Sequence, residues 1–236
     1  MISCLLFYLL TTGETDPKWE RFLLVERQEQ TREGLTRAGL FVPKMKNLFR
    51  EEGVPEDLVW LALIESSFRP FAKSPTGAVG LFQFKKKTAR NFGLKVTSTL
   101  DERTFPYRAA SCSARYLKYL YQKFQNWDLV LAAYNLGEGD LRRTMIRTQT
   151  QTWDQVKVHL RRETREYVPK VRTAIRIGNA FMAKGEKTAY FLYCVQRGDT
   201  LFQIAKRHHA EVKEVQRLNG MKHAHIQVGQ TLVLPL

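Results

Sequence analysis

The hydrophobic pattern of this chain changes once, near residue 185, and the change divides the sequence into two parts. Before it, apolar side chains recur at helical spacing, as in the series Ala110, Ala114, Leu117, Tyr121 and Phe124. After it, the segments 191–195 and 231–236 have strand character, with two short segments of helical spacing between them. At 236 residues and 44% hydrophobic, the chain can bury one large core and a smaller one. The sequence therefore predicts a mainly α-helical fold: a helical domain over 16–185, a linker over 186–192 and a small β-α-α-β module over 193–236.

Short-range signals mark where several helices begin and end. Capping residues precede helical segments at Asn126, at Thr152 with Gln155, and at Thr200 with Gln203. A last long helix is predicted from about Glu163 to Lys184, where Gly185 stops it. The segment 80–93 is also predicted as helical, ending at Gly93.

Glu65 occupies an unusual position in the apolar stretch LALIESSF. It continues a helical stripe formed by Leu58, Leu61 and Ala62. Burying an unpaired carboxylate costs on the order of several kcal/mol. The charge of Glu65 must therefore be compensated by other groups, or its unfavourable burial must serve a function. These residues alone leave two interpretations open. Glu65 is either a general acid whose pKa is raised by desolvation, or a structural glutamate paired with Arg69 or another cation.

Three ordered motifs favour the first interpretation. The stretches ESSFRPFAKSPTGAVGLFQF, LAAYNLGEG and ETREYVPKV resemble the successive motifs of the lytic transglycosylase family with a goose-type-lysozyme-like fold, in particular its membrane-bound type D branch. This resemblance runs from about Phe41 to Ala183. The segment 193–235 resembles a LysM module, a fold that binds chains containing N-acetylglucosamine. Together they imply a lysozyme-like, all-helical catalytic domain joined to a peptidoglycan-binding module.

The resemblance also implies the site residues. It makes Glu65 the single catalytic acid and base, and it assigns the substrate groove to Ser74, Gln83, Tyr134, Asn135 and Tyr167. Seen alone, Ser74 before a proline is most simply a turn residue, and the two tyrosines are core aromatics. Gln83, expected within an apolar helix, must be a hydrogen-bond hub or a ligand contact.

Four positions depart from the family pattern: Phe82, Lys85, Lys86 and Leu136. None of them removes a group assigned to the chemistry. They bear on the shape of the groove floor, and so on the preferred glycan length or peptide decoration.

The implied activity is non-hydrolytic cleavage of the β-1,4 bond between N-acetylmuramic acid and N-acetylglucosamine, with 1,6-anhydro ends as products, in cell-wall remodelling or turnover. It requires no cofactor and no metal. Two alternatives stay open: a hydrolytic muramidase on the same scaffold, and a wall-binding protein without activity. The LysM module is expected to supply localisation and avidity rather than chemistry.

The charge balance bears on partners. The chain has 38 Lys and Arg against 23 Asp and Glu, a net charge of +15. The segment 193–236 holds six basic and three acidic side chains, so the helical part is the more basic one. Such a field favours a polyanion. The basic runs at 85–87, 142–143 and 161–162 belong to no nucleic-acid motif, so we expect peptidoglycan strands rather than nucleic acid as partner, with peripheral association with wall or membrane.

The remaining signals are weak. The apolar run from Ile2 to Leu10 lacks a charged start and is either a degenerate or truncated export signal or an N-terminal apolar segment, assigned to residues 1–15. Three scattered cysteines predict no disulfide framework, and Cys112 is expected to be a buried thiol. Four C-terminal histidines lack matching ligands and are expected to be solvated or packed: His208, His209, His223 and His225. The expected location is the cell envelope, in the periplasm, at the outer membrane or secreted.

Overall fold

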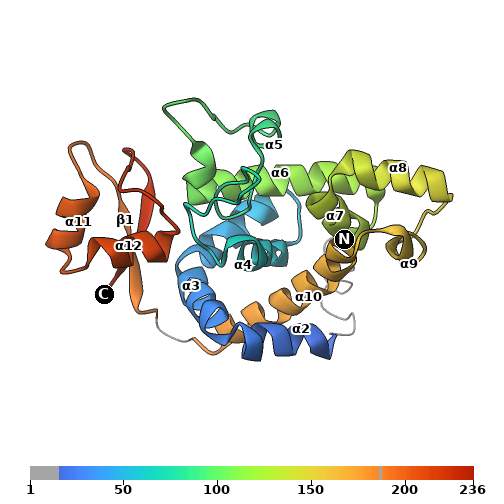
Figure 1. Cartoon of the computed structure of the whole chain (residues 1–236), viewed down its shortest axis with the longest axis horizontal. Coiled ribbons are helices and arrows are strands. Elements are labelled where there is room, and N and C mark those ends of the chain that lie inside the picture. The colour runs from blue at the N-terminus through green and yellow to red at the C-terminus, as the bar shows by residue number, and fades with distance from the viewer. Residues whose placement is uncertain (1–15, 186–187) are drawn as a thin grey trace.

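A computed structural model describes residues 16–185 and 188–236 of the chain. The apolar segment predicted within residues 1–15 lies outside this part. Figure 1 shows a large helical domain and, at one side of it, a small C-terminal module that contains the two described strands. We use "helical domain" for residues 16–185 and "C-terminal module" for residues 188–236.

The helical domain is built from α-helices joined by short 3-10 or π-helical turns. The turns are Phe22–Glu26, Glu56–Trp60, Glu102–Thr104 and Lys157–His159. The α-helices are α2 (Pro17–Arg21), α3 (Gln28–Glu51), α4 (Leu61–Ser66), α5 (Lys86–Asn91), α6 (Pro106–Phe124), α7 (Trp127–Leu136), α8 (Glu138–Thr148), α9 (Trp153–Val156) and α10 (Arg162–Ala183).

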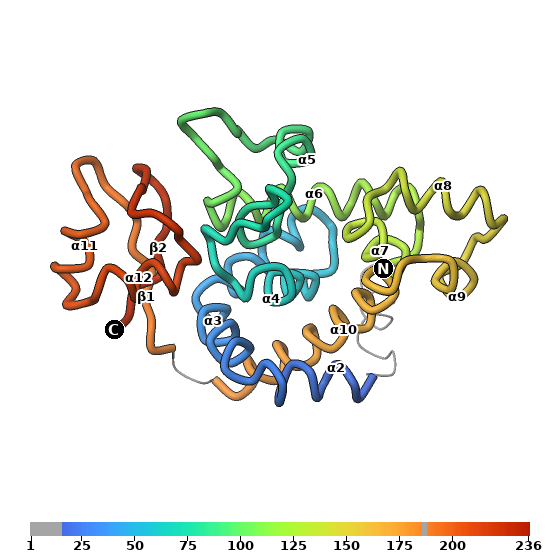
Figure 2. The backbone as a smooth tube through the Cα atoms, in the orientation of Figure 1, coloured from blue at the N-terminus to red at the C-terminus, as the bar shows by residue number. Residues whose placement is uncertain are grey.

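The C-terminal module has the predicted β-α-α-β order. Its elements are β1 (Tyr190–Cys194), α11 (Leu201–Arg207), α12 (Val212–Asn219) and β2 (Thr231–Pro235). The two strands pair antiparallel, with Tyr190 opposite Pro235. In the tube of Figure 2 the strands cross the module side by side, and α11 and α12 cover them.

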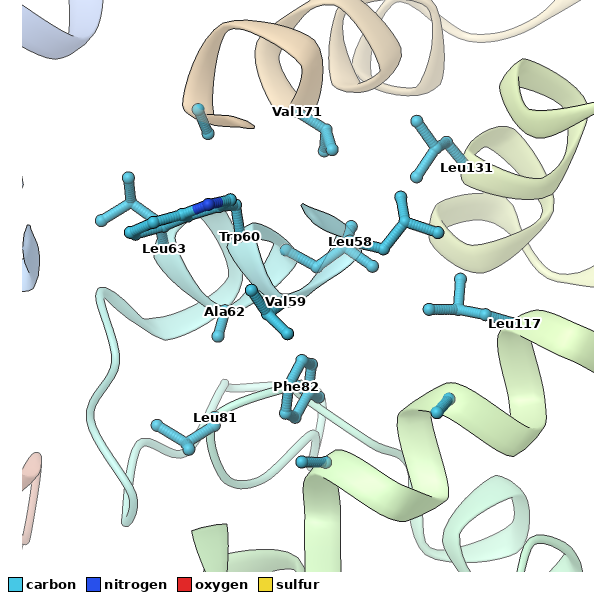
Figure 3. Packing of buried hydrophobic residues seen from close by; sticks show 14 of the residues in the cluster. Leu58, Val59, Trp60, Ala62, Leu63, Leu81, Phe82, Leu117, Leu131 and Val171 are labelled. Carbon is cyan, nitrogen blue, oxygen red and sulfur yellow. The ribbon is translucent and has the colours of Figure 1, made fainter. Parts of the chain in front are cut away.

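The short helix α4 lies at the centre of the main core. The turn before it and its first residues bury Leu58, Trp60 and Leu61 completely. Figure 3 shows Leu58 and Trp60 packed between α10 and α6, with Phe82 beneath them. Trp60 lies so close to α10 that a Cβ on Gly178 would be 2.3 Å from its ring. The end of α4, where Glu65 lies, is therefore held by tight packing on both sides.

Most local predictions are confirmed. The Asn126 side chain accepts from two backbone amides at the start of α7, and Thr152 with Gln155 forms a capping box. Helix α10 ends at Ala183, close to the predicted stop at Gly185. Cys112 is fully buried, and burial raises its pKa to about 12.

The predicted helix over 80–93 is wrong in its first half, because only Lys86–Asn91 is helical. Two residues ahead of it have left-handed backbone, Gly80 with φ 85° and Gln83 with φ 50°. They let the chain turn back so that Val79 and Phe84 exchange backbone hydrogen bonds of 3.1 Å. A Cβ on Gly80 would lie 1.9 Å from the carbonyl oxygen of Arg103, so this close approach requires glycine.

No helix within residues 16–185 or 188–236 is both long and apolar enough to cross a membrane.

Candidate active site

Glu65 lies in the last turn of α4, directly before a tight reversal of the chain. Ser67 and Phe68 have left-handed backbone, with φ of 51° and 55°. Their amides donate back to the carbonyl groups of Leu63 and Ala62, each at 3.1 Å. Two consecutive non-glycine residues in this conformation persist only where the surrounding structure enforces it. The carboxyl group therefore projects from a backbone that is fixed on both sides.

Tyr167 on α10 supplies the hydrogen-bond partner of this carboxyl group. Its buried hydroxyl donates to Oε1 of Glu65 across 102 residues of sequence. No cation of the described residues lies within ion-pair distance of Glu65. Arg69 instead contacts Glu33, at 3.8 Å. The interpretation of Glu65 as a structural ion-pair partner of Arg69 is therefore wrong.

The environment raises the pKa of Glu65 to about 7. Desolvation is the largest cause, and the nearby charge of Glu163 acts in the same direction. The hydrogen bond from Tyr167 and the positive charge of Lys170 oppose the rise. Glu65 as a whole residue is partly exposed to solvent, but its carboxyl group is buried. This burial outweighs the hydrogen bond from Tyr167 and the charge of Lys170. A carboxyl group of this kind is partly protonated near neutral pH, so it can both donate and accept a proton.

Tyr134 on α7 borders the same site. Its hydroxyl donates to the carbonyl oxygen of Phe82 at 2.8 Å. Burial, followed by the charge of Glu65, holds the pKa of Tyr134 well above its usual value. The ring also packs against Tyr116, with centroids 5.5 Å apart. Tyr134 therefore joins the core to the turn that carries Phe82.

Gln83 lies in that turn and serves as a hydrogen-bond hub. Its Nε2 donates to the carbonyl oxygen of Gly80 at 2.8 Å and to that of Ala72 at 3.2 Å. The Ser66 hydroxyl, next to Glu65, donates to the carbonyl oxygen of Leu81 at 2.9 Å. Gln83 thus braces a turn that is tied directly to the end of α4, and it does not belong to a helix as its sequence context predicted.

Ser74 does not contact Glu65. Its hydroxyl accepts from the backbone amide of Ala78 at 2.9 Å and lies 3.1 Å from the hydroxyl of Thr76. These contacts close the loop 74–78, which is the turn role that Ser74 has when considered alone.

Asn135 faces a groove beside the site. Its Oδ1 accepts from the Thr164 hydroxyl at 2.9 Å, which links α7 to α10. Both residues line a groove of about 880 Å³. Other residues that line it are Arg143, Arg147, His159, Arg161 and Glu163. An elongated polar ligand in this groove would pass close to the face of α10 that carries Tyr167.

Two residues of the site are absent from the sequence-based assignment, Glu163 and Lys170. They lie four residues before and three residues after Tyr167 in α10, so all three share one helical face. The motif ETREYVPK holds the signal that could have identified both residues, because charged side chains at these spacings lie beside the tyrosine on a helix. Among residues 16–185 and 188–236 there is no group of three His, Cys, Asp or Glu side chains placed to hold a metal ion.

Both parts of the chain are similar to known protein families. Residues 45–157 match the family described as Transglycosylase SLT domain, and residues 193–235 match the LysM domain. Membrane-bound lytic murein transglycosylase D of Escherichia coli strain K12 is 33% identical over 125 residues, which is 52% of this chain and 28% of that protein. Peptidoglycan transglycosylase gp16 of Escherichia phage T7 is 46% identical over 92 residues, or 38% of this chain and 7% of that protein.

A solved structure shows the same fold. The 70-kDa soluble lytic transglycosylase of Escherichia coli superposes with a TM-score of 0.50 at 22% identity, covering 70% of this chain and 32% of the other. The chain spans about a third or less of the length of these relatives. The two family matches follow each other in the order predicted from the motifs. The chain thus carries a transglycosylase SLT domain followed by a C-terminal LysM domain.

Proposed function

We propose that this chain is a peptidoglycan lytic transglycosylase in which Glu65 is the catalytic acid and base. The observation that carries the proposal is the partly protonated carboxyl group at the end of α4, with a pKa of about 7 and a buried tyrosine as its hydrogen-bond partner. Its place within the matched SLT segment and the names of the relatives support the same activity.

The proposed reaction uses one carboxyl group twice. Protonated Glu65 donates its proton to the glycosidic oxygen, and the bond from C1 of N-acetylmuramic acid to that oxygen breaks. The N-acetyl group of the same sugar can stabilise C1, as in substrate-assisted glycosidases. The C6 hydroxyl then attacks C1 and gives its proton to the Glu65 carboxylate, which closes the 1,6-anhydro ring. No water is consumed, and Glu65 ends protonated as it began.

The other assigned residues would shape the groove around this reaction. Tyr167 would orient the Glu65 carboxyl group, while Asn135 would contact the sugar chain in the adjoining groove. Tyr134, Gln83 and Ser74 would act mainly by fixing the turns at the floor of the groove.

A second candidate function is hydrolysis by a muramidase, and one electrostatic interaction favours it. Glu163 is close enough to raise the pKa of Glu65 through its charge, so a second carboxylate is available near the groove to activate water. We place this function second, because Glu163 is exposed and has no hydrogen-bond partner within the described residues that would fix its position.

The proposed cellular role follows from the two domains. A LysM domain over 193–236 would hold glycan strands that contain N-acetylglucosamine, and the helical domain over 16–185 would cleave them in remodelling or turnover of the wall. The net charge of +15 favours association with an anionic wall or membrane surface in the cell envelope.

The substitution Glu65→Gln tests the proposal. The amide nearly preserves shape but cannot donate and recover a proton, so we expect turnover on purified sacculi to fall by about three orders of magnitude or more, with binding to sacculi retained. A variant that kept more than about a tenth of the activity would exclude Glu65 as the acid. A wild-type chain that cleared no zone in a peptidoglycan zymogram would support a wall-binding protein instead.

A further inference from the structure

The C-terminal module is docked on the segment that follows Glu65. Phe71, from the helical domain, is 7% exposed and belongs to the hydrophobic core of the module. It packs there with Val195, Leu201, Ile204, Ala205, Val215, Leu232 and Leu234. Its backbone amide donates to the carbonyl oxygen of Asn219 at 2.8 Å. The core of the module is therefore completed by a side chain of the other domain.

The end of α12 lies directly against this segment. Gly220, with φ 72°, follows α12. A Cβ on it would lie 3.1 Å from Cβ of Arg69 and 3.2 Å from the backbone of Ala72. Asn219, fully buried beside it, exchanges hydrogen bonds of 2.8 Å with the backbone of Val233. Helix α12 and strand β2 thus form one rigid surface that receives the segment 69–72.

Ion pairs continue from α12 to the turn after Glu65. Arg217 of α12 contacts Glu33 of α3. Glu33 lies 3.3 Å from the guanidinium of Arg37, which is completely buried. Nε of Arg37 donates to the carbonyl oxygen of Ser67 at 3.0 Å. A charge on the module is therefore linked, through the two intermediate residues Glu33 and Arg37, to the left-handed turn that begins two residues after Glu65.

The segment 69–72 also supports the Gln83 turn. The carbonyl oxygen of Ala72 accepts from the amide of Gly80 at 2.9 Å and from Nε2 of Gln83. Ala72 directly follows Phe71, so displacement of Phe71 would move an acceptor that Gln83 needs. A further contact, from Nε2 of Gln230 to the hydroxyl of Thr104 at 3.1 Å, fixes the module from another direction.

We propose that the C-terminal module is a structural part of the candidate active site, with Phe71 and Arg217 as positioning residues that hold the turn after Glu65 and the Gln83 turn in place. This inference rests on the proposed function for its activity readout. It differs from the expectation that the module is a tether, since a tether would contribute avidity and leave the geometry around Glu65 unchanged. In Figure 2 the module lies beside α3 and the segment after α4, in agreement with these contacts.

The activity test uses full-length chains and short soluble glycan fragments, for which avidity for the wall is irrelevant. We expect Phe71→Ala to lower kcat about 100-fold, the scale of a misplacement of about 1 Å at a reacting group, with a smaller change in KM. Phe71→Leu should restore most of the activity, because a leucine refills the hydrophobic position. Phe202→Ala is the matched control, since Phe202 is 65% exposed on α11.

The charge test uses an exposed residue, whose substitution leaves the packing of the hydrophobic core intact. Arg217 is half exposed, so Arg217→Glu replaces its attraction to Glu33 by repulsion without opening a cavity. Lys213→Glu is the matched control, because Lys213 is an exposed residue of the same helix and makes the same charge change. We expect kcat on soluble fragments to fall about tenfold for Arg217→Glu, one decade of rate, and to stay at the wild-type value for Lys213→Glu.

Hydrogen exchange gives a readout that does not depend on the reaction. Amides of residues 61–72 should exchange faster in Phe71→Ala and Arg217→Glu than in wild type or in the two controls. If residues 61–72 exchange faster in the two variants than in wild type, but wild type cleaves no glycan, the proposed function fails and this inference stands. Unchanged kcat in Arg217→Glu, or unchanged exchange of 61–72 in both variants, would overturn the inference. If Phe71→Ala fails to fold, Arg217→Glu decides alone.

Discussion

Replacing Glu65 by glutamine should remove one defined contribution to the pH dependence of the protein's stability. The pKa of Glu65 is raised from the ordinary glutamate value of 4.5 to about 7 in the folded chain. The folded state therefore binds this proton more tightly than the unfolded state. The associated stability is fully present below pH 4.5 and is lost as the pH rises through about 7. Glutamine stays neutral, so the variant loses none of it.

The magnitude follows from the two pKa values. At about 1.36 kcal/mol for each pH unit, the difference between about 7 and 4.5 corresponds to about 3 kcal/mol. Partial solvent access to Glu65 reduces this value, so it is an upper bound. The free energy of unfolding of Glu65→Gln minus that of wild type should accordingly rise by about 2 to 3 kcal/mol between about pH 4 and pH 8.5.

Urea denaturation of both chains at several pH values measures this difference. All other titrating groups are shared, so their contributions cancel, and any packing effect of the amide adds an offset that does not vary with pH. Glu51→Gln, which removes an exposed carboxylate at the end of α3, is the control. A difference that stayed constant within about 0.5 kcal/mol, or that fell with rising pH, would refute the raised pKa of Glu65.

Three further substitutions test separate contacts. Glu163→Gln removes a charge that raises the pKa of Glu65, so the alkaline limb of the profile of kcat/KM against pH should move to lower pH; an unmoved limb would show that this charge does not reach Glu65. Tyr134→Phe removes one hydrogen bond to Phe82 and should lower activity less than tenfold, at a cost of about 1 kcal/mol in urea denaturation; a loss as large as that of Glu65→Gln would give the hydroxyl a part in the chemistry. Gly178→Ala places a Cβ 2.3 Å from the Trp60 ring and should destabilise the helical domain by about 1 to 3 kcal/mol; a wild-type melting temperature would contradict the packing of α4 on α10.

Local features of the fold were predictable from the sequence because their causes are local. The caps at Asn126 and Thr152 need only residues two or three positions away, and both form as predicted. The β-α-α-β order of the C-terminal module follows from a change of period within the segment 193–236. The catalytic assignment to Glu65 and its groove residues remains a proposal.

Long-range features were not predictable in the same way. Gly80 has left-handed backbone and lies against the carbonyl oxygen of Arg103, a residue distant in the sequence, so the pattern of apolar residues wrongly indicated a helix there. The hydrogen bond from Tyr167 to Glu65 joins residues 102 positions apart, and the pair of Arg217 with Glu33 joins residues 184 positions apart. For the same reason the sequence presents the C-terminal module as a tether. Only the structure places Phe71 inside its core.

Digestion of purified peptidoglycan in oxygen-18 water tests the central claim most directly. If the C6 hydroxyl of N-acetylmuramic acid attacks C1 after Glu65 donates its proton, mass spectrometry should show 1,6-anhydro ends that are lighter by one water than hydrolysed ends and carry no label. Labelled reducing ends as the main product would show that water attacks C1. That result would contradict the transglycosylase assignment and establish a muramidase, with Glu163 as the first carboxylate to examine for activation of the water.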